Sequence, residues 1–108
     1  MILTGLVRPR DGSAAGEGTD REDLAACSSG SPDALERLYW RYAGACLALS
    51  RDILHDEHLA RKAVLETFLQ LWREASDIDP ERTSIGAWLA LWTRHRATVG
   101  LESEARIG

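Results

Sequence analysis

Aromatic and basic side chains are concentrated in residues 68–97, where their spacing suits contact with nucleic acid. This stretch holds three of the four tryptophans, an Asp-Pro pair and an Arg-His-Arg cluster. Aromatic rings stack on unpaired bases, and arginines beside them neutralise phosphates. Because an Asp-Pro pair favours a turn, the stretch is predicted to form a helix, a short loop and a second helix.

The loop and the second helix carry the candidate contacts. Arg82, Arg94 and Arg96 can each neutralise one phosphate. Thr83 and Ser84 bring hydroxyls and backbone N–H groups to a predicted helix start, which is a natural anion site. These residues therefore form the first candidate nucleic-acid surface.

The same residues also have purely structural interpretations. Trp72, Trp88 and Trp92 lie on apolar stripes and are predicted to be mainly core. The Arg-His-Arg cluster is also typical of a solvated helix end, where positive charge is favourable. Trp40 lies off the main stripe, so it is either exposed to a partner or covers a helix junction.

Other chemistries find little support in the sequence. His55 and His58 form only a weak metal-binding pattern without a further ligand pair, so no metal or cofactor is predicted. We recognise no nucleophile–base motif and no glycine-rich phosphate loop, so no catalytic residue is predicted and the chain is not expected to be an enzyme. Cys27 and Cys46 lie among small and apolar residues, which favours buried thiols in a reducing cytoplasm.

Composition limits how such a chain can bind. Its 108 residues suggest one small domain, and its net charge of −4 means that any nucleic-acid contact must be local. No apolar run approaches the roughly 20 residues that cross a membrane, so membrane insertion is not expected.

The elements that position these residues are all predicted to be helices. Apolar residues recur at three- and four-residue spacing, without strand alternation. The predicted fold is all-α, a compact bundle of three main helices plus a short N-terminal helix. The helices are expected over residues 20–28, 32–54, 56–76 and about 84–100, with a loop over 77–83.

Glycines and capping residues mark the boundaries. Residues 1–19 are expected to be a flexible tail, residues 20–100 the domain, and residues 101–108 a tail or the start of a linker. Gly44 is expected at a close helix contact, and Gly100 at a helix end. The expected N-caps are Ser31, Asp56, and either Thr83 or Ser84.

Several pieces of the sequence occur in the order and at the spacing of a known family. They are Asp20-Arg-Glu-Asp-Leu-Ala-Ala-Cys27, Asp33-Ala-Leu-Glu-Arg-Leu-Tyr-Trp-Arg-Tyr42, Glu66-Thr-Phe-Leu-Gln-Leu-Trp72, Asp79-Pro-Glu-Arg-Thr-Ser-Ile-Gly-Ala-Trp-Leu89 and Arg94-His-Arg-Ala97. With these pieces, residues 20–100 resemble region 2 of bacterial RNA polymerase sigma factors. The nearest class is the small extracytoplasmic-function group.

The resemblance implies a role in transcription initiation without catalysis. It implies that the third helix binds the clamp helices of the largest polymerase subunit. The loop Ile78–Ile85 would hold a flipped base of the displaced non-template strand at the minus-ten element. The DNA-binding set would be Arg82, Thr83, Ser84, Trp88, Arg94, His95 and Arg96. The polymerase- or partner-binding set would be Arg61, Lys62, Glu66, Gln70 and Arg73.

The third helix departs from the family pattern at its partner-facing positions. Arg61 and Lys62 stand where the family usually has acidic residues, and only Glu66 of the expected acids remains. Like charges opposed across an interface lower affinity. We therefore keep a second hypothesis, a diverged sigma-like protein-interaction module with weakened polymerase docking. It would bind an anti-sigma factor or another regulator, or self-associate.

Overall fold

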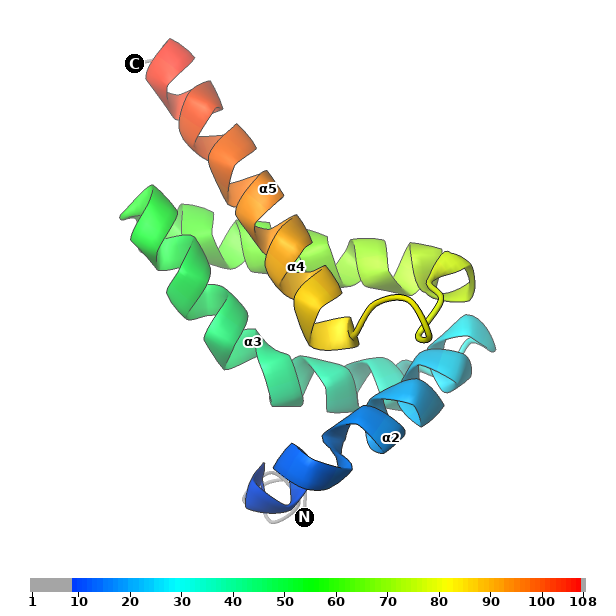
Figure 1. Ribbon diagram of the computed structural model, residues 1–108. Helices are drawn as coiled ribbons and strands as arrows, with labels where there is room; N and C mark the ends of the chain where they lie inside the picture. The colour runs from blue at the N-terminus through cyan, green and yellow to red at the C-terminus, as the bar shows by residue number, and fades with distance from the viewer. Residues whose placement is uncertain (1–8, 108) are drawn as a thin grey trace.

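The computed structural model describes the backbone of residues 9–107 and the side chains of residues 19–105. The described backbone forms four α-helices and one 3₁₀ turn, with no strand among them, which confirms the all-α prediction (Figure 1). The elements are α2 (Pro9–Ser28), α3 (Pro32–Leu54), α4 (Glu57–Glu74), η1 (Ala75–Asp77) and α5 (Ile85–Ile107).

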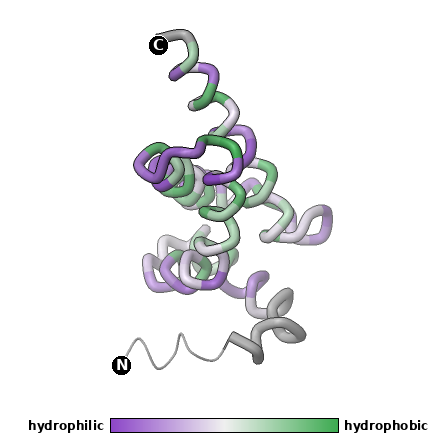
Figure 2. Tube along the Cα trace, turned by 90° about the vertical axis from the view of Figure 1, so that its left-hand side faces the viewer, coloured by the Kyte–Doolittle hydropathy of each residue, from purple (hydrophilic) through white to green (hydrophobic). Residues whose placement is uncertain are grey.

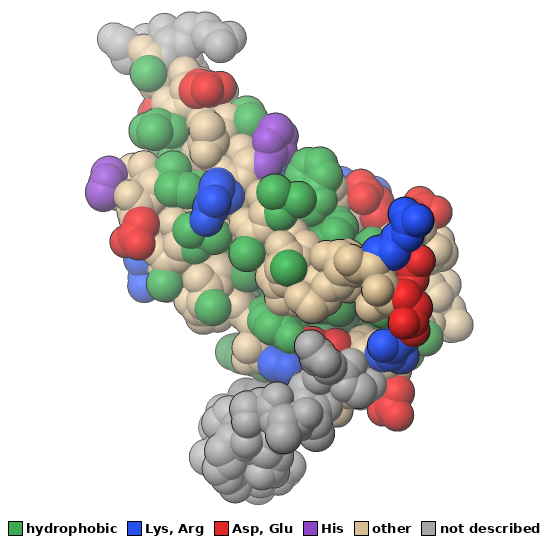
Figure 3. Space-filling model, viewed as in Figure 1, with side chains coloured by type: hydrophobic (Ala, Val, Ile, Leu, Met, Phe, Trp, Pro, Cys, Tyr) green, Lys and Arg blue, Asp and Glu red, His purple; other side chains and the backbone are tan. Residues whose placement is uncertain are grey.

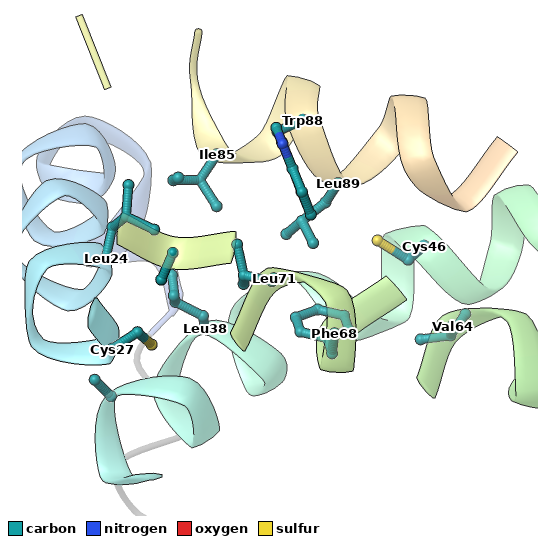
Figure 4. Close-up of a cluster of buried hydrophobic side chains, with 12 residues drawn as sticks. Leu24, Cys27, Leu38, Cys46, Val64, Phe68, Leu71, Ile85, Trp88 and Leu89 are labelled. Atoms are coloured by element: carbon teal, nitrogen blue, oxygen red, sulfur yellow. The ribbon is translucent and has the colours of Figure 1, made fainter. Parts of the chain in front are cut away.

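The core forms where α3, α4 and α5 meet, since each of these helices contacts the other two. Leu38 of α3, Leu71 of α4 and Leu89 of α5 are completely buried. Figure 4 shows these three side chains directed into one space, with Phe68 and Trp88 beside them. Hydrophobic residues gather where the helices cross, while the end of α5 projects beyond the other helices (Figure 2).

The start of each of the three main helices has the predicted capping chemistry, in which a side-chain oxygen accepts a backbone N–H. Ser84, rather than Thr83, caps α5. At the other end of α3, His55 adopts a left-handed conformation with φ of 55°, which turns the chain into α4. The capping bonds are Ser31 to Ala34 N at 3.3 Å, Asp56 to Leu59 N at 2.9 Å, and Ser84 to Ala87 N at 3.0 Å.

Both outer helices are longer than predicted. α2 begins at Pro9 rather than near residue 20, so the expected tail is helical from Pro9 onward, and residues 1–8 lie outside the described part. Proline suits a first helical position because it has no N–H to leave unpaired. α5 continues through Gly100 to Ile107, so the expected tail over 101–107 is helical. Gly100 lies against Leu54, and the residues after it favour a helix.

The close helix contact expected at Gly44 is formed at a different glycine. Gly44 is exposed, and a Cβ built there would meet no atom within 4 Å. At Gly86 the same Cβ would lie 3.2 Å from a ring carbon of Tyr42. The expectation was wrong because Gly44 lies on the solvent side of α3. The close approach of α3 and α5 lies at Gly86 instead.

α2 is fixed to α3 by a buried ionic network that the sequence did not suggest. Asp20 and Asp23 are buried, and both pair with Arg41. Arg37 donates from Nε to Asp23 Oδ1 at 2.9 Å, and the Tyr42 hydroxyl donates to Asp20. Since buried carboxylates are stable only when paired, these contacts hold α2 against α3, together with Leu24 and Cys27, which α2 contributes to the core.

The two cysteines are buried and free, as predicted. Cys27 of α2 and Cys46 of α3 both lie in the hydrophobic core cluster (Figure 4). Burial raises the pKa of both thiols, which favours the unreactive protonated form.

The shared core predicts a large difference between two neighbouring leucines of α5. Leu89 is fully buried, whereas Leu91 is 62% exposed. Leu89→Ala should lower the free energy of unfolding by about 2–5 kcal/mol, because it removes buried methyl groups and leaves a cavity. Leu91→Ala, the matched control, should change it by less than about 0.5 kcal/mol. Urea denaturation followed by circular dichroism measures both, and equal losses would contradict this core.

Candidate nucleic-acid and partner interfaces

The loop between η1 and α5 is an organised turn built on Asp79. The Asp79 carboxylate accepts the Glu81 N–H at 2.9 Å, and its carbonyl accepts the N–H groups of Arg82 at 3.0 Å and Thr83 at 3.2 Å. The Arg82 side chain is 84% exposed and its guanidinium lies 3.8 Å from the Asp79 carboxylate. The predicted turn is confirmed, and the head of Arg82 is accessible to a ligand.

A hollow of about 190 Å³ opens between this loop and α2. Residues 80–85 form one side, and Asp20 and Arg21 form the other. Arg21 pairs with Glu81 across this hollow, which joins α2 to the loop. Acidic and basic side chains lie side by side at this end of the molecule, on the right of Figure 3. The contribution of α2 was missed because its residues lie about 60 positions away in sequence.

The two hydroxyls at the start of α5 have different surroundings. Ser84 Oγ is engaged in capping the helix. The Thr83 hydroxyl donates to the Ser84 carbonyl at 3.3 Å, a long bond that an incoming acceptor can replace. Of the two, Thr83 is therefore the better candidate for a direct ligand contact.

The structure separates the two arginines of the Arg-His-Arg cluster. Residues two apart on a helix point about 200° apart, so they cannot share a face. Arg94 is exposed and has no ion partner among the described side chains. Arg96 instead turns to α4, where its Nε and Nη2 lie 3.1 and 2.9 Å from Gln70 Oε1 and its Nη1 lies 3.5 Å from Glu66. Only Arg94 remains positioned for a phosphate on the solvent side.

The tryptophans of the aromatic stretch belong mainly to the core, as predicted. Trp88 is buried, and Trp72 and Trp92 are partly buried against the core cluster. His95 is exposed and meets the edge of Trp92, with ring centroids 5.3 Å apart. Trp88 can thus support the loop from beneath, while His95 remains accessible.

Of the two alternatives for Trp40, exposure or covering a helix junction, the structure shows exposure. It is 51% exposed, its ring packs on Tyr39, and its indole N–H lies 3.4 Å from a Glu36 carboxylate oxygen. It therefore presents an aromatic surface on α3.

Arg61 and Lys62, the two basic residues of α4 at positions where acidic residues were expected, have different surroundings. Arg61 donates to Glu57 at 2.7 Å, and Arg51 donates to the same carboxylate at 2.7 and 2.9 Å. The hydrogen bond from Arg51, assisted by that from Arg61, lowers the pKa of Glu57 to about 2. Glu57 thus stays ionised at neutral pH and pairs with both Arg61 and Arg51, so its single negative charge is shared between two arginines. Lys62 has no ion partner among the described side chains.

A groove of about 380 Å³ lies between α4 and the C-terminal half of α5. Four of the five predicted partner residues, Lys62, Glu66, Gln70 and Arg73, line it, and His95 and Arg96 line the opposite side. Sequence reasoning missed this groove because it expected α5 to end at Gly100, whereas residues 103 and 104 also line it.

Neither a metal centre nor a membrane span is found in the described part of the chain. No group of three or more His, Cys, Asp or Glu side chains there is placed to hold a metal ion. None of the described helices combines the length and the apolar character that a bilayer span needs.

Comparison with known proteins returns one family. The family model named Sigma-70 region 2 matches residues 38–107, which cover most of α3 and all of α4 and α5. No curated protein and no solved structure matches the chain.

The different environments of Arg94 and Arg96 can be tested by stability. Arg96→Ala leaves the buried Gln70 amide oxygen without its donor, which should cost about 1–2 kcal/mol of unfolding free energy. Arg94→Ala removes the same charge from the same helix and should stay within about 0.5 kcal/mol of wild type. Thermal or urea unfolding gives the comparison, and an equal cost for both variants would contradict the Arg96–Gln70 contact.

Proposed function

The chain belongs to the sigma-70 region 2 family, which acts in transcription initiation, and we propose that it binds core RNA polymerase and recognises the minus-ten promoter element. The observation that carries this proposal is the hollow beneath the loop before α5, with the exposed Arg82 beside it. Holding a displaced strand requires a recess for a base and a nearby cation for its phosphate.

The DNA side of the proposal uses the loop and the exposed side of α5. Arg82 neutralises a phosphate next to the hollow, and Thr83 offers its weakly held hydroxyl to a base edge or phosphate. Arg94 and His95 extend the contact along α5. Trp88 supports this surface from the core, and Ser84 supports it by capping the helix. Because the whole chain carries a net charge of −4, binding by this domain alone is weak and depends on these few cations.

The polymerase side of the proposal uses α4 and the groove beside it. Glu66 lies on this surface, the buried Gln70 lies beneath it at the groove, and Arg96 of α5 contacts both of them. Arg96 is therefore assigned to the partner surface rather than to DNA. Helix α5 therefore takes part in both proposed surfaces, with Arg94 on the DNA side and Arg96 on the α4 side.

Two arginines test the DNA role. Arg82→Ala and Arg94→Ala should each weaken binding of a single-stranded minus-ten oligonucleotide and reduce the slope of log K against log salt by about 0.7. Arg51→Ala removes an equal charge at the far end of α3 and should bind like wild type. Fluorescence anisotropy at several salt concentrations measures all four proteins. If the two loop-side variants match Arg51→Ala, the DNA surface is misplaced.

A second candidate function is a diverged sigma-like interaction module that binds an anti-sigma factor or another regulator. The observation that favours it is the uncompensated Lys62 on α4, at a position where an acidic residue is typical of the family. In this case the fold is retained, but docking to the polymerase clamp helices is weak.

A pull-down on the isolated polymerase clamp helices separates the two candidates. Polymerase docking predicts that the wild-type chain is retained. The interaction-module hypothesis predicts retention only after Arg61→Glu/Lys62→Asp, which restores acidic residues on α4. Lys62→Asp alone is the informative intermediate, because Arg61 is already paired with Glu57. Strong wild-type retention would rule out the second candidate.

A further inference from the structure

We propose that the outer face of α4 binds an acidic amphipathic helix of a partner protein. This inference rests on the proposed role of α4 as a partner-binding surface and adds the chemistry of the partner. It is carried by two exposed leucines, two cations without partners, and the groove that runs beside them.

The first observation is an apolar strip in the middle of α4. Leu65 is 54% exposed and Leu69 is 53% exposed, and they lie four residues apart on one side of the helix. Exposed leucines at this spacing are typical of a helix that lays an apolar face against another helix.

The second observation is the balance of charge around that strip. Arg61 pairs with Glu57, and Glu66 pairs with Arg96. Among the described side chains, Lys62 and Arg73 have no acidic partner and no hydrogen bond. The face therefore offers two exposed positive charges without an ion partner among the described side chains, and carboxylates of a partner can pair with them.

The positions of these two cations define the spacing that a partner must match. Lys62 and Arg73 are eleven residues apart, which is about three helical turns and about 16 Å along the axis. The leucines lie between them on the same side of α4. A helix laid along this face would present apolar residues in the middle and a carboxylate near each end.

The groove beside α4 favours a protein partner. Lys62 and Arg73 both line it, and Trp92 and Val99 of α5 add apolar surface. A partner helix resting on the leucines can place a side chain in this groove. A phosphate backbone would meet the two cations but would leave the leucines uncovered, so nucleic acid is the poorer match.

Self-association through the same face is also a poor match. In a two-fold dimer contacts are reciprocal, so that if one residue contacts a second residue of the partner, the second also contacts the first residue of the partner. Either Lys62 would face Lys62 or it would face Arg73, and both arrangements oppose like charges.

Two synthetic peptides test the proposal with the full chain. One is an 18-residue amphipathic helix with a leucine stripe and glutamates eleven positions apart, and the other carries lysines at those two positions. Fluorescence anisotropy should show the acidic peptide binding about tenfold more tightly, with an advantage that falls as salt rises. Equal affinities for the two peptides would overturn the proposal.

Matched variants locate the binding face. Lys62→Gln/Arg73→Gln should weaken the acidic peptide about five- to tenfold. Ala90→Glu/Thr98→Glu lowers the net charge by the same two units at exposed positions of α5 outside the groove, and should have an effect of less than about twofold. Leu65→Ser/Leu69→Ser should weaken both peptides. If the two charge variants behave alike, α4 is not the site.

The same variants keep this proposal distinct from the DNA role. Lys62→Gln/Arg73→Gln should leave binding of the minus-ten oligonucleotide unchanged, whereas Arg82→Ala and Arg94→Ala should leave binding of the acidic peptide unchanged. If Lys62→Gln/Arg73→Gln abolishes oligonucleotide binding and the acidic peptide does not bind, α4 is a nucleic-acid surface and the proposal fails. Loss of the DNA role alone would not affect the peptide result.

Discussion

The close packing of α3, α4 and α5 around Leu38, Leu71 and Leu89 is the constraint on which both candidate interfaces depend. One fully buried leucine from each helix sets the angles at which the helices cross. Those angles place the loop before α5 over Asp20 and Arg21 of α2, where the hollow forms. They also leave the C-terminal half of α5 beside α4, where the groove forms. Because protein cores are closely packed and rigid, this one core fixes the positions of both the hollow and the groove.

Outside the hydrophobic core, arginine side chains also hold neighbouring elements together. Arg41 pairs with two buried carboxylates of α2, Arg21 joins α2 to the loop, and Arg96 joins α5 to α4. Planar guanidinium groups suit such roles because one side chain can satisfy two acceptors. The consequence for function is that few arginines remain for ligands. On the side proposed to meet DNA these are Arg82 and Arg94, and on α4 the cations without an ion partner among the described side chains are Lys62 and Arg73.

Most of the fold was predictable because its signals are local. The caps at Ser31 and Asp56, the apolar periodicity and the Asp-Pro turn each act within a few residues, and each is confirmed. The family assignment is also confirmed, whereas the extracytoplasmic-function class stays a prediction. One error is the start of α2, which begins at Pro9 rather than near residue 20, and two others concern glycines. Gly100 does not end α5, and Gly86 rather than Gly44 lies at the close crossing. A glycine permits a helix end or a close contact, and only its neighbours in space decide which forms.

The sequence by itself determined the helices, their order, the core tryptophans and which charged residues the chain carries, because these follow from residue type and spacing along the chain. Only the tertiary structure decided which of those charges are free. Arg94 and Arg96 are two positions apart in sequence, yet one faces solvent and the other holds Gln70 on α4. Arg61 and Lys62 are adjacent, yet only Arg61 has an ion partner among the described side chains. Spacing along one helix allows the Glu57–Arg61 pair, but whether Glu66 pairs with Lys62 of its own helix or with Arg96 of α5 depends on side chains meeting across helices, and that information is absent from the spacing.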